Sequence, residues 1–242
     1  MSQFDAPPGS PSDSAASASP SPVHVLHDDG ANSSQKSDSS GGPVSAALPE
    51  RTILDDRAIR RALMRIAHEI VESIEDAESL FLVAIPNGGV PLGRILVENL
   101  ESLTGLRPPL GILDTTLYRD DLSTRGSRPR LRRTEMPSSV DGRVVVLVED
   151  VVNTGRTIRA GMDALMDFGR PSHVRVVALV DRGHRELPIK IDFVGKNIPT
   201  QPDEKVIFRA GPSETTGGET SGEWGETDAV DLQLIVQGGK GS

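Results

Sequence analysis

The chain of 242 residues has no cysteine, which excludes disulfide bonds and metal sites built on thiolates. No run of about 18 apolar residues indicates a transmembrane helix, and the N-terminus lacks the basic and apolar regions of a secretory signal. We therefore expect a soluble, cytoplasmic protein without a membrane partner. Aromatic residues make up only 3% of the chain, so recognition of nucleic acid would depend on shape and phosphate contacts more than on base stacking.

Two common phosphate-binding motifs are absent as well. A Walker A loop reads Gly-x-x-x-x-Gly-Lys-Ser/Thr, but around Gly155 the chain has Asp150 in place of the first glycine and Arg156 in place of the lysine. A Rossmann fingerprint needs three spaced glycines, which this stretch lacks. Any phosphate site must therefore be of another kind.

The net charge of −9 is unevenly distributed along the chain. Residues 51–200 carry 22 Lys and Arg against 21 Asp and Glu, so the acidity belongs to the two ends and does not exclude an anionic partner. The first 48 residues are rich in Ser, Pro, Ala, Gly and Asp, which predicts a disordered tail. We expect one domain over residues 49–237, with a flexible loop at 211–228 and a disordered tail at 238–242.

The most informative stretch runs from Val144 to Gly169. Apolar, mostly β-branched residues at 144–148 predict a buried parallel strand, and Glu149 and Asp150 stand where it should end. A short loop follows, and apolar positions at helical spacing then predict a helix from about Thr157 to Gly169.

The loop between this strand and helix has the chemistry of an anion site. Amides at a helix N-terminus point outward, the helix dipole favours negative charge, and the hydroxyls of Thr154 and Thr157 add donors. Gly155 allows close approach of the backbone. Two carboxylates nearby suit the vicinal hydroxyls of a ribose, with Mg²⁺ screening any pyrophosphate. The expected ligand is a phosphorylated ribose; the alternative is an ordinary strand-to-helix connection.

A second turn of similar character lies earlier in the chain. Leu80–Ile85 predicts a strand and Leu92–Leu103 a helix, and Pro86-Asn87-Gly88-Gly89 between them exposes several amides. Alone, this turn could be only a tight connection. Two such turns on successive crossovers of one sheet indicate a common ligand crevice.

The remaining elements complete an α/β fold with a mainly parallel, twisted sheet flanked by helices. A helix expected at Asp56–Ile74 has an apolar face and an opposite face with Arg61, Arg65 and His68, which is either a binding surface or ordinary solvated charge. Further strands are expected at Leu110–Leu117, His173–Val180, Glu204–Phe208 and Val230–Val236.

Residues 119–133 contain six Arg and two Asp, and Gly126 and Pro129 oppose regular structure. We interpret this segment as a mobile basic loop that covers the ligand and excludes water. The alternatives are a nucleic-acid patch and a merely solvated loop.

Several blocks resemble known families. The stretch 144–157 is similar to the phosphoribosyl pyrophosphate (PRPP) motif of type I phosphoribosyltransferases. It has an apolar strand, two acids, two apolar residues and then x-Thr-Gly-x-Thr. Longer blocks resemble the PyrR family of bifunctional pyrimidine-operon regulators and uracil phosphoribosyltransferases, over roughly residues 51–208: Ile53–Glu69, Leu117–Leu122, Ala164–Pro171, Val180–Ile189 and Phe193–Thr200. The resemblance implies a type I phosphoribosyltransferase fold with a small hood and a flexible active-site loop.

The same resemblance implies two activities. One is the conversion of uracil and PRPP to UMP and pyrophosphate, with Mg²⁺ carried mainly by PRPP and no metal held by the protein alone. The other is binding of the leader of pyrimidine-gene messenger RNA in response to UMP or UTP. A homodimer or larger homo-oligomer is also implied.

The family's functional positions carry over to residues of this chain. Arg119 and Asp150 would be catalytic, with Arg119 neutralising charge on the pyrophosphate, and Asn87 and Gly88 would bind that pyrophosphate. PRPP would be held by Glu149, Asp150, Val151, Val152, Asn153, Thr154, Gly155, Arg156 and Thr157, and the base by Arg182 and Val206. RNA would be contacted by Arg61, Arg65, His68, His184, Arg185, Lys190 and Lys196.

The chain also departs from the family pattern. Asn87-Gly88-Gly89 stands where Thr-Arg-Gly is expected, which removes a guanidinium near the pyrophosphate, and Asn153 replaces a usual Tyr. Glu149 stands for Asp, and Met64 for a hydroxyl residue in the first helix. These departures leave two alternatives open: a nucleotide-sensing regulator with little or no catalysis, and a salvage enzyme for another base.

Overall fold

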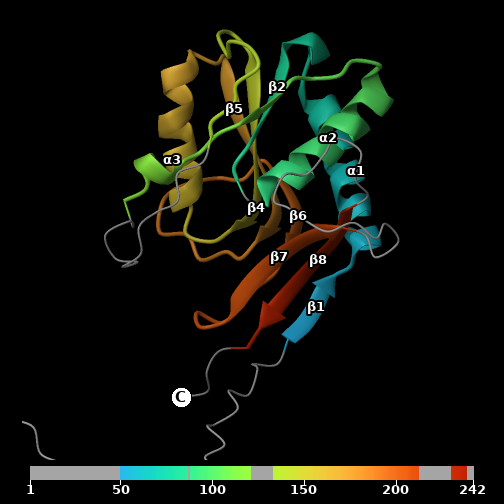
Figure 1. Ribbon diagram of the computed structural model, residues 1–242, viewed down its shortest axis with the longest axis vertical. Helices are drawn as coiled ribbons and strands as arrows, with labels where there is room; N and C mark the ends of the chain where they lie inside the picture. Colours follow the sequence, from blue (N-terminus) through green and yellow to red (C-terminus); the bar gives the residue numbers. More distant parts are fainter. Residues whose placement is uncertain (1–49, 87, 121–132, 213–229, 239–242) are drawn as a thin grey trace, which may run out of the picture. The chain divides into compact units, whose positions relative to one another are not determined.

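The computed structural model describes residues 50–86, 88–120, 133–212 and 230–238. Within these ranges the chain forms a five-stranded sheet, in the order β3-β2-β4-β5-β6, and a separate three-stranded sheet (Figure 1). All neighbouring strands of the larger sheet are parallel. Its strands are β2 (Leu80–Ala84), β3 (Leu110–Ile112), β4 (Val144–Val152), β5 (His173–Asp181) and β6 (Phe193–Asn197).

Helices cover both faces of the parallel sheet, with α1 and α2 on one face and α3 on the other (Figure 1). Successive side chains of a strand point to opposite faces. On β4, Val146 and Val148 accordingly pack with α1 and α2, whereas Val145 and Leu147 pack with α3. This confirms the expected α/β fold. The helices are α1 (Asp56–Ser73), α2 (Gly89–Thr104) and α3 (Arg156–Leu165).

The smaller sheet is antiparallel and has the order β1-β8-β7. Buried Leu232 and Leu234 on β8 belong to the same apolar core as α1 and α2, so this sheet packs on the larger one rather than forming a separate core. It corresponds to the expected small hood. Its strands are β1 (Glu50–Leu54), β7 (Lys205–Pro212) and β8 (Val230–Gln237).

Helix α1 is tied to the edge strand β6 by Arg65. The Arg65 guanidinium donates to the carbonyl oxygens of Val194 and Gly195, both at 2.9 Å, and also pairs with Glu69 one helical turn away. Strand β6 is an edge strand, with no further strand to pair with among the described residues. Arg65 therefore has a structural role in addition to any role at the surface.

Several expected strand boundaries are wrong. Strand β4 continues to Val152, so Glu149 and Asp150 lie inside the strand instead of beyond it. Strand β3 ends at Ile112 rather than Leu117. The reason is Asp114, whose carboxylate accepts a hydrogen bond from the Thr116 amide at 2.9 Å and starts a short 3₁₀ turn.

Other expectations are close to what the structure shows. The helix expected at 56–74 is α1, and the strand expected at 173–180 is β5 with one further residue. Helix α2 begins earlier than expected, and β1 and β6 were not expected at all. Strand β7 continues to Pro212, past the expected end at Phe208, so the first two residues of the loop expected at 211–228 belong to a strand. The N-terminal tail, most of the basic loop and residues 213–228 lie outside the described residues. None of the helices in the described ranges combines the length and apolar character needed to cross a membrane.

Candidate active site

A cavity of about 340 Å³ opens at the carboxyl edge of the parallel sheet, between β4 and the start of α3. Arg119 and Glu186 reach it from two other segments. Its lining includes Glu149 and every residue from Val151 to Ile158, and therefore nearly all of the PRPP loop expected from the sequence. Open α/β sheets bind ligands in the crevice at this edge. Asp150 is the one member of the expected loop that does not line the cavity.

The loop after β4 has the geometry of an anion site. Gly155 caps α3 in the left-handed region, with φ of 90°, a conformation that side chains other than glycine's adopt at a cost. A Cβ at this position would also lie 3.1 Å from the Ile189 side chain. The first amides of α3 have no partners within the helix, and its dipole adds partial positive charge. Gly155 thus shapes the turn that presents these amides to the cavity.

Glu149 is buried in this cavity with unusual electrostatics. The residue is only 8% exposed, and its Oε2 atom has no hydrogen-bond partner among the described residues. Burial, together with the adjacent charge of Asp150, raises the pKa of Glu149 well above its usual range, while the positive charge of Arg119 acts in the opposite direction. Burial also raises the pKa of Asp150. A buried acceptor without a donor is the feature that a ligand hydroxyl or a metal ion would satisfy.

Arg119 lines the same cavity and contacts the start of α3 directly. Its Nη1 donates to the Thr157 hydroxyl at 3.0 Å. A guanidinium at this place can neutralise negative charge that develops on a leaving group. The expected catalytic position of Arg119 is therefore compatible with the structure, whereas residues 121–132 of the basic loop lie outside the described residues.

The connection between β5 and β6 holds the loop after β4 through hydrogen bonds to the loop's backbone. The Arg185 guanidinium donates to the Asn153 carbonyl oxygen at 2.8 Å and pairs with Asp181 at 2.6 Å. The amides of Glu186 and Leu187 both donate to the Thr154 carbonyl oxygen, at 3.0 and 3.2 Å. Arg185 was expected on an RNA-binding surface, but its guanidinium is directed into the active-site loop.

The second turn, before α2, meets the first one through Asp150. A Cβ on Gly88 would overlap the carboxylate and the Cβ of Asp150, so glycine is required while Asp150 holds this position. The two turns thus lie side by side, but no described residue of the second turn lines the cavity, so a common ligand crevice remains a prediction. No guanidinium can extend from position 88, and Asn87 lies outside the described residues.

The two residues expected to bind the base do not line the cavity. The Arg182 guanidinium donates to the Thr200 hydroxyl and to the Glu204 carbonyl oxygen, both at 2.8 Å, and so holds the segment that leads into β7. Val206 is half-buried on β7 and packs against the core shared with α1 and α2. Contact of either residue with a base remains a prediction.

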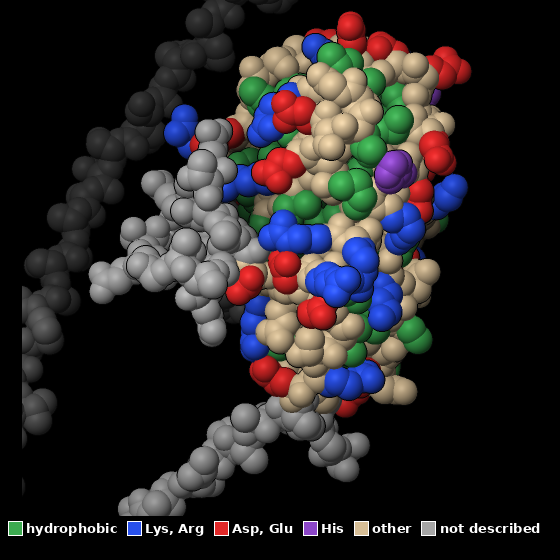
Figure 2. All heavy atoms as spheres, turned by 90° about the vertical axis from the view of Figure 1, so that its right-hand side faces the viewer, with side chains coloured by type: hydrophobic (Ala, Val, Ile, Leu, Met, Phe, Trp, Pro, Cys, Tyr) green, Lys and Arg blue, Asp and Glu red, His purple; other side chains and the backbone are tan. Residues whose placement is uncertain are grey.

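The basic residues of α1 and β6 lie on neighbouring elements. Arg61, His68 and Lys196 are exposed, and the contact of Arg65 with Val194 and Gly195 joins the two elements that carry them. Figure 2 faces the side on which α1 lies and shows Lys and Arg side chains gathered near the middle of that face. Lys190 and His184 are also exposed, and His184 is hydrogen-bonded to the Thr200 carbonyl oxygen. The two sequence clusters are therefore close in space at α1 and β6.

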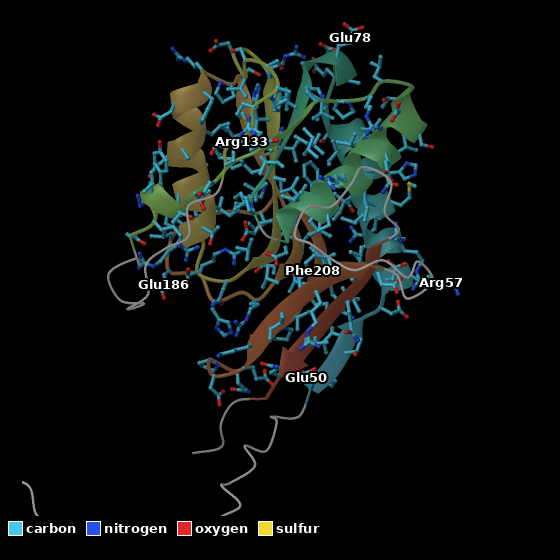
Figure 3. The ribbon with its side chains drawn as sticks, in the orientation of Figure 1. Glu50, Arg57, Glu78, Arg133, Glu186 and Phe208 are labelled. Carbon is cyan, nitrogen blue, oxygen red and sulfur yellow. The ribbon has the colours of Figure 1, made fainter. Side chains whose placement is uncertain are left out.

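Sequence reasoning missed Asp120 and Glu186 as parts of the site. Their carboxylates pair with Arg156 at 2.6 and 2.7 Å, and Figure 3 shows Glu186 at the end of α3 that lies toward the smaller sheet. Both lie in loops, and no spacing in the sequence indicates that they meet one side chain. Only the fold brings them together.

The acids of the site fit a Mg²⁺ ion that arrives with a ligand. In the part of the chain that the structure describes, no three His, Asp or Glu side chains are grouped to hold a metal ion. Mg²⁺ is usually bound by one or two carboxylates together with substrate phosphates. Glu149, with its unsatisfied oxygen, and Asp150 can supply that number of carboxylates.

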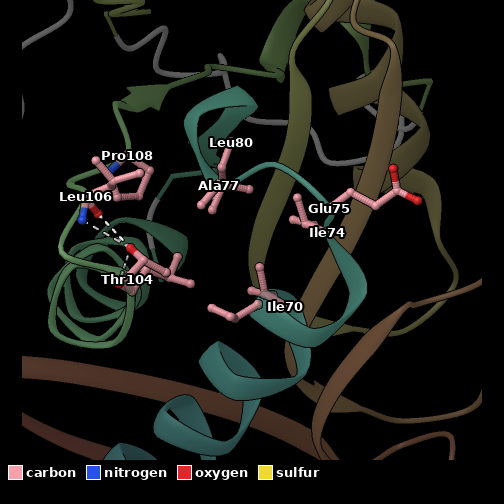
Figure 4. A pocket seen from close by; sticks show the side chains of 10 residues that line it. Ile70, Ile74, Glu75, Ala77, Leu80, Thr104, Leu106 and Pro108 are labelled. Atoms are coloured by element: carbon pink, nitrogen blue, oxygen red, sulfur yellow. Dashed lines mark hydrogen bonds between the residues drawn. The ribbon is translucent and has the colours of Figure 1, made fainter.

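A second cavity, of about 190 Å³, lies between the C-terminal parts of α1 and α2 (Figure 4). Its lining is mostly apolar, and Figure 4 shows the Glu75 carboxylate pointing away from it. The Thr104 hydroxyl on its wall is already bonded to the Leu100 carbonyl oxygen at 2.8 Å. This cavity offers no charged group for a phosphorylated ligand.

Comparisons with known proteins agree with this geometry. A family model described as "Phosphoribosyl transferase domain" matches residues 50–212. The chain is 52% identical over 171 residues to "Bifunctional protein PyrR" of Roseiflexus sp. (strain RS-1), covering 71% of this chain and 92% of that protein. It is 54% identical over 163 residues to the protein of the same name from Pelotomaculum thermopropionicum, covering 67% and 90%.

Solved structures show the same fold. A hypoxanthine phosphoribosyltransferase from Staphylococcus aureus superimposes with a TM-score of 0.53 and 20% identity, covering 69% of this chain and 85% of that one. At this identity the likeness concerns the fold alone.

We expect Glu149→Gln to stabilise the ligand-free protein at neutral and alkaline pH. The raised pKa of Glu149 means that the folded chain holds this proton more tightly than the unfolded chain. The stability that results is complete below the unfolded-state pKa and is lost as the pH rises through the folded-state pKa. The Gln side chain stays neutral at every pH. The free energy of unfolding of the variant should therefore exceed that of the parent by an amount that grows with pH and reaches on the order of 1 kcal/mol, or about 2–4 °C in Tm.

Thermal unfolding of both proteins between pH 5 and 9 measures this effect. Glu72→Gln, at an exposed carboxylate of α1, serves as the matched control and should change the free energy of unfolding by less than about 0.5 kcal/mol. A loss of stability in Glu149→Gln at every pH would mean that the Glu149 carboxylate is a structural group.

Proposed function

Because the chain belongs to the PyrR family of phosphoribosyltransferases, we propose that it converts uracil and PRPP to UMP and pyrophosphate. We further propose that it binds the leader of pyrimidine-gene messenger RNA in response to uridine nucleotides. Since messenger RNA is the proposed partner, the protein would act in the cytoplasm. The family resemblance supports a homodimer or larger homo-oligomer.

The observation that carries the enzymatic proposal is the buried, unsatisfied carboxylate of Glu149 in the same cavity as the amides of the α3 N-terminus. A ribose 5-phosphate satisfies both features at once. Its hydroxyls donate to the acids, and its phosphate accepts hydrogen bonds from the Asn153–Thr157 turn.

Catalysis would then consist of positioning and charge neutralisation. The bond from the ribose to pyrophosphate breaks as the bond from the ribose to the base nitrogen forms. That nitrogen releases its proton to solvent, and negative charge develops on the pyrophosphate. Arg119 stabilises that charge, and Mg²⁺ bound with PRPP supplies further positive charge when present. Glu149 and Asp150 are the residues that would complete the oxygen ligands of the ion. No covalent nucleophile on the protein is required.

The proposed RNA surface consists of Arg61, His68 and Lys196, with Arg65 between them. All four residues are exposed, and none lines the active-site cavity. Cations on adjacent elements can follow an RNA backbone by phosphate contacts. Because Arg65 also holds α1 against β6, its replacement would test two roles at once, and it is left out of the experiment below.

Gly88 favours a second candidate function, a regulator that binds nucleotides with little catalysis. Glycine at this position supplies no side chain to the pyrophosphate, and the Asp150 carboxylate lies where a side chain would begin. The third candidate, salvage of another base, rests on Asn153. Its Oδ1 atom is buried without a hydrogen-bond partner, at a position where the resemblance leads one to expect Tyr.

Base-dependent release of pyrophosphate from Mg²⁺-PRPP separates these candidates. We expect release with uracil and at least about 100-fold less with hypoxanthine or guanine, since a site built for one base leaves polar groups unpaired with another. Turnover with a purine only would establish the third candidate. No turnover with any base, combined with UMP binding, would establish the second.

For the RNA activity, we expect the double variant Arg61→Gln/Lys196→Gln to bind a transcript of the host's own pyrimidine-operon leader more weakly in the presence of UMP. Loss of two phosphate contacts should reduce the slope of log affinity against log salt by about 2. Affinity for UMP should stay unchanged, because neither residue lines the cavity.

The matched control is Arg107→Gln/Arg170→Gln, which removes the same charge from exposed positions outside α1 and β6. Both variants are compared in filter-binding titrations at several salt concentrations. Equal RNA binding by the two double variants would show that the basic face of α1 and β6 is ordinary solvated charge.

A further inference from the structure

Three segments that line the active-site cavity meet at the side chain of Arg156. Its Nη1 pairs with Asp120 at 2.6 Å and its Nε with Glu186 at 2.7 Å. Asp120 directly follows Arg119, and Glu186 belongs to the connection between β5 and β6. Arg156 itself is the first residue of α3. One guanidinium therefore joins parts of the chain that are far apart in sequence.

Each of the two carboxylates that pair with Arg156 lies in a residue that is next to, or itself contacts, a group of the proposed site. Next to Asp120, Arg119 donates to the Thr157 hydroxyl at 3.0 Å. On the other side, the Glu186 amide donates to the Thr154 carbonyl oxygen at 3.0 Å. The pair Asp120–Arg156 thus fixes the backbone that carries Arg119, and the pair Glu186–Arg156 fixes the phosphate loop.

The Arg156 guanidinium is already paired with two carboxylates, so it is not free to bind an anion. Its hydrogen bond to Glu186 and the charges of Asp120 and Glu186 raise the pKa of Arg156, so it stays protonated at every working pH. Two carboxylates surround one guanidinium, and an incoming phosphate would have to displace them. Phosphate contacts from this residue are therefore expected from its backbone amide, at the N-terminus of α3. This amide donates to the Thr154 hydroxyl oxygen at 3.3 Å and would exchange that partner for a phosphate oxygen.

We propose that Arg156 is a positioning residue, whose guanidinium holds Arg119 and the phosphate loop at a fixed separation for the transfer step. This inference rests on the proposed phosphoribosyl transfer. Misplacement of a reacting group by about 1 Å can reduce a rate 100-fold, whereas exposed ion pairs contribute little to stability. The effect of Arg156 should accordingly fall on the transfer step more than on folding or nucleotide affinity.

The test compares Arg156→Gln with Arg159→Gln. Arg159 lies on the same helix face, pairs mainly with Asp163 at 2.8 Å and approaches Asp120 only at 3.8 Å. Kinetics with Mg²⁺-PRPP and uracil, calorimetric titration of UMP, and hydrogen exchange of the Glu186 and Leu187 amides are measured for both variants and for the parent.

For Arg156→Gln we expect kcat to fall at least about 10-fold, with KM for PRPP and UMP affinity within about 3-fold of the parent. Exchange of the two amides should become faster. Arg159→Gln should match the parent in all three measurements. Asp120→Asn should cause part of the loss in kcat, and it should cause no further loss when combined with Arg156→Gln.

Two results overturn the inference: an unchanged kcat in Arg156→Gln, or a fall in UMP affinity as large as the fall in kcat. The second result would make Arg156 a direct ligand contact. A parent protein that releases no pyrophosphate with any base overturns the proposed transfer instead. In that case hydrogen exchange of the Glu186 and Leu187 amides alone tests the role of Arg156. An unchanged exchange rate in Arg156→Gln would show that the Arg156 guanidinium does not hold the loop.

Discussion

Burial of two adjacent carboxylates at the end of β4 is the constraint on which the site depends. Ionised carboxylates in such a place are costly unless they are paired, and the Oε2 atom of Glu149 has no partner among the described residues. The surroundings offset part of this cost. Arg119 faces Glu149, the first turn of α3 adds a positive dipole, and Gly88 leaves room for Asp150. Proteins retain such unfavourable arrangements at functional sites, where a ligand completes them.

The connection between β5 and β6 links this site to the basic surface. At one end, residues 185–187 hold the carbonyl groups of Asn153 and Thr154. At the other end the chain enters β6, whose backbone carbonyls accept the hydrogen bonds of Arg65 from α1. A nucleotide that orders the loop therefore acts on a segment continuous with the proposed RNA surface. This continuity gives the proposed sensor a physical basis, since a ligand can shift only the elements with which it makes different contacts in two states.

The parts of the fold that were predictable from the sequence have strong local signals. The apolar run of β4, the two acids and the Thr-Gly-x-Thr turn specify their own geometry, and α1 shows a clear helical period. The end of β3 was not predictable from the apolar pattern, because the Asp114 carboxylate accepts hydrogen bonds from the amide and the hydroxyl of Thr116 and so favours a turn there. The structural roles of Arg65 and Arg185, and the meeting of Asp120 and Glu186 at Arg156, depend on contacts between distant segments, which leave no periodic pattern in the sequence.

The central claim is that the acids of β4 and the adjoining loop bind a phosphorylated ribose. Calorimetric titration of UMP into the parent, Asp150→Asn and the control Asp163→Asn, an exposed acid on α3, tests it most directly. The account predicts binding by the parent and the control, and at least about 10-fold weaker binding by Asp150→Asn without loss of thermal stability, since a hydrogen bond to a charged group is worth about 1.5–3 kcal/mol. Equal affinity in all three proteins would contradict the account.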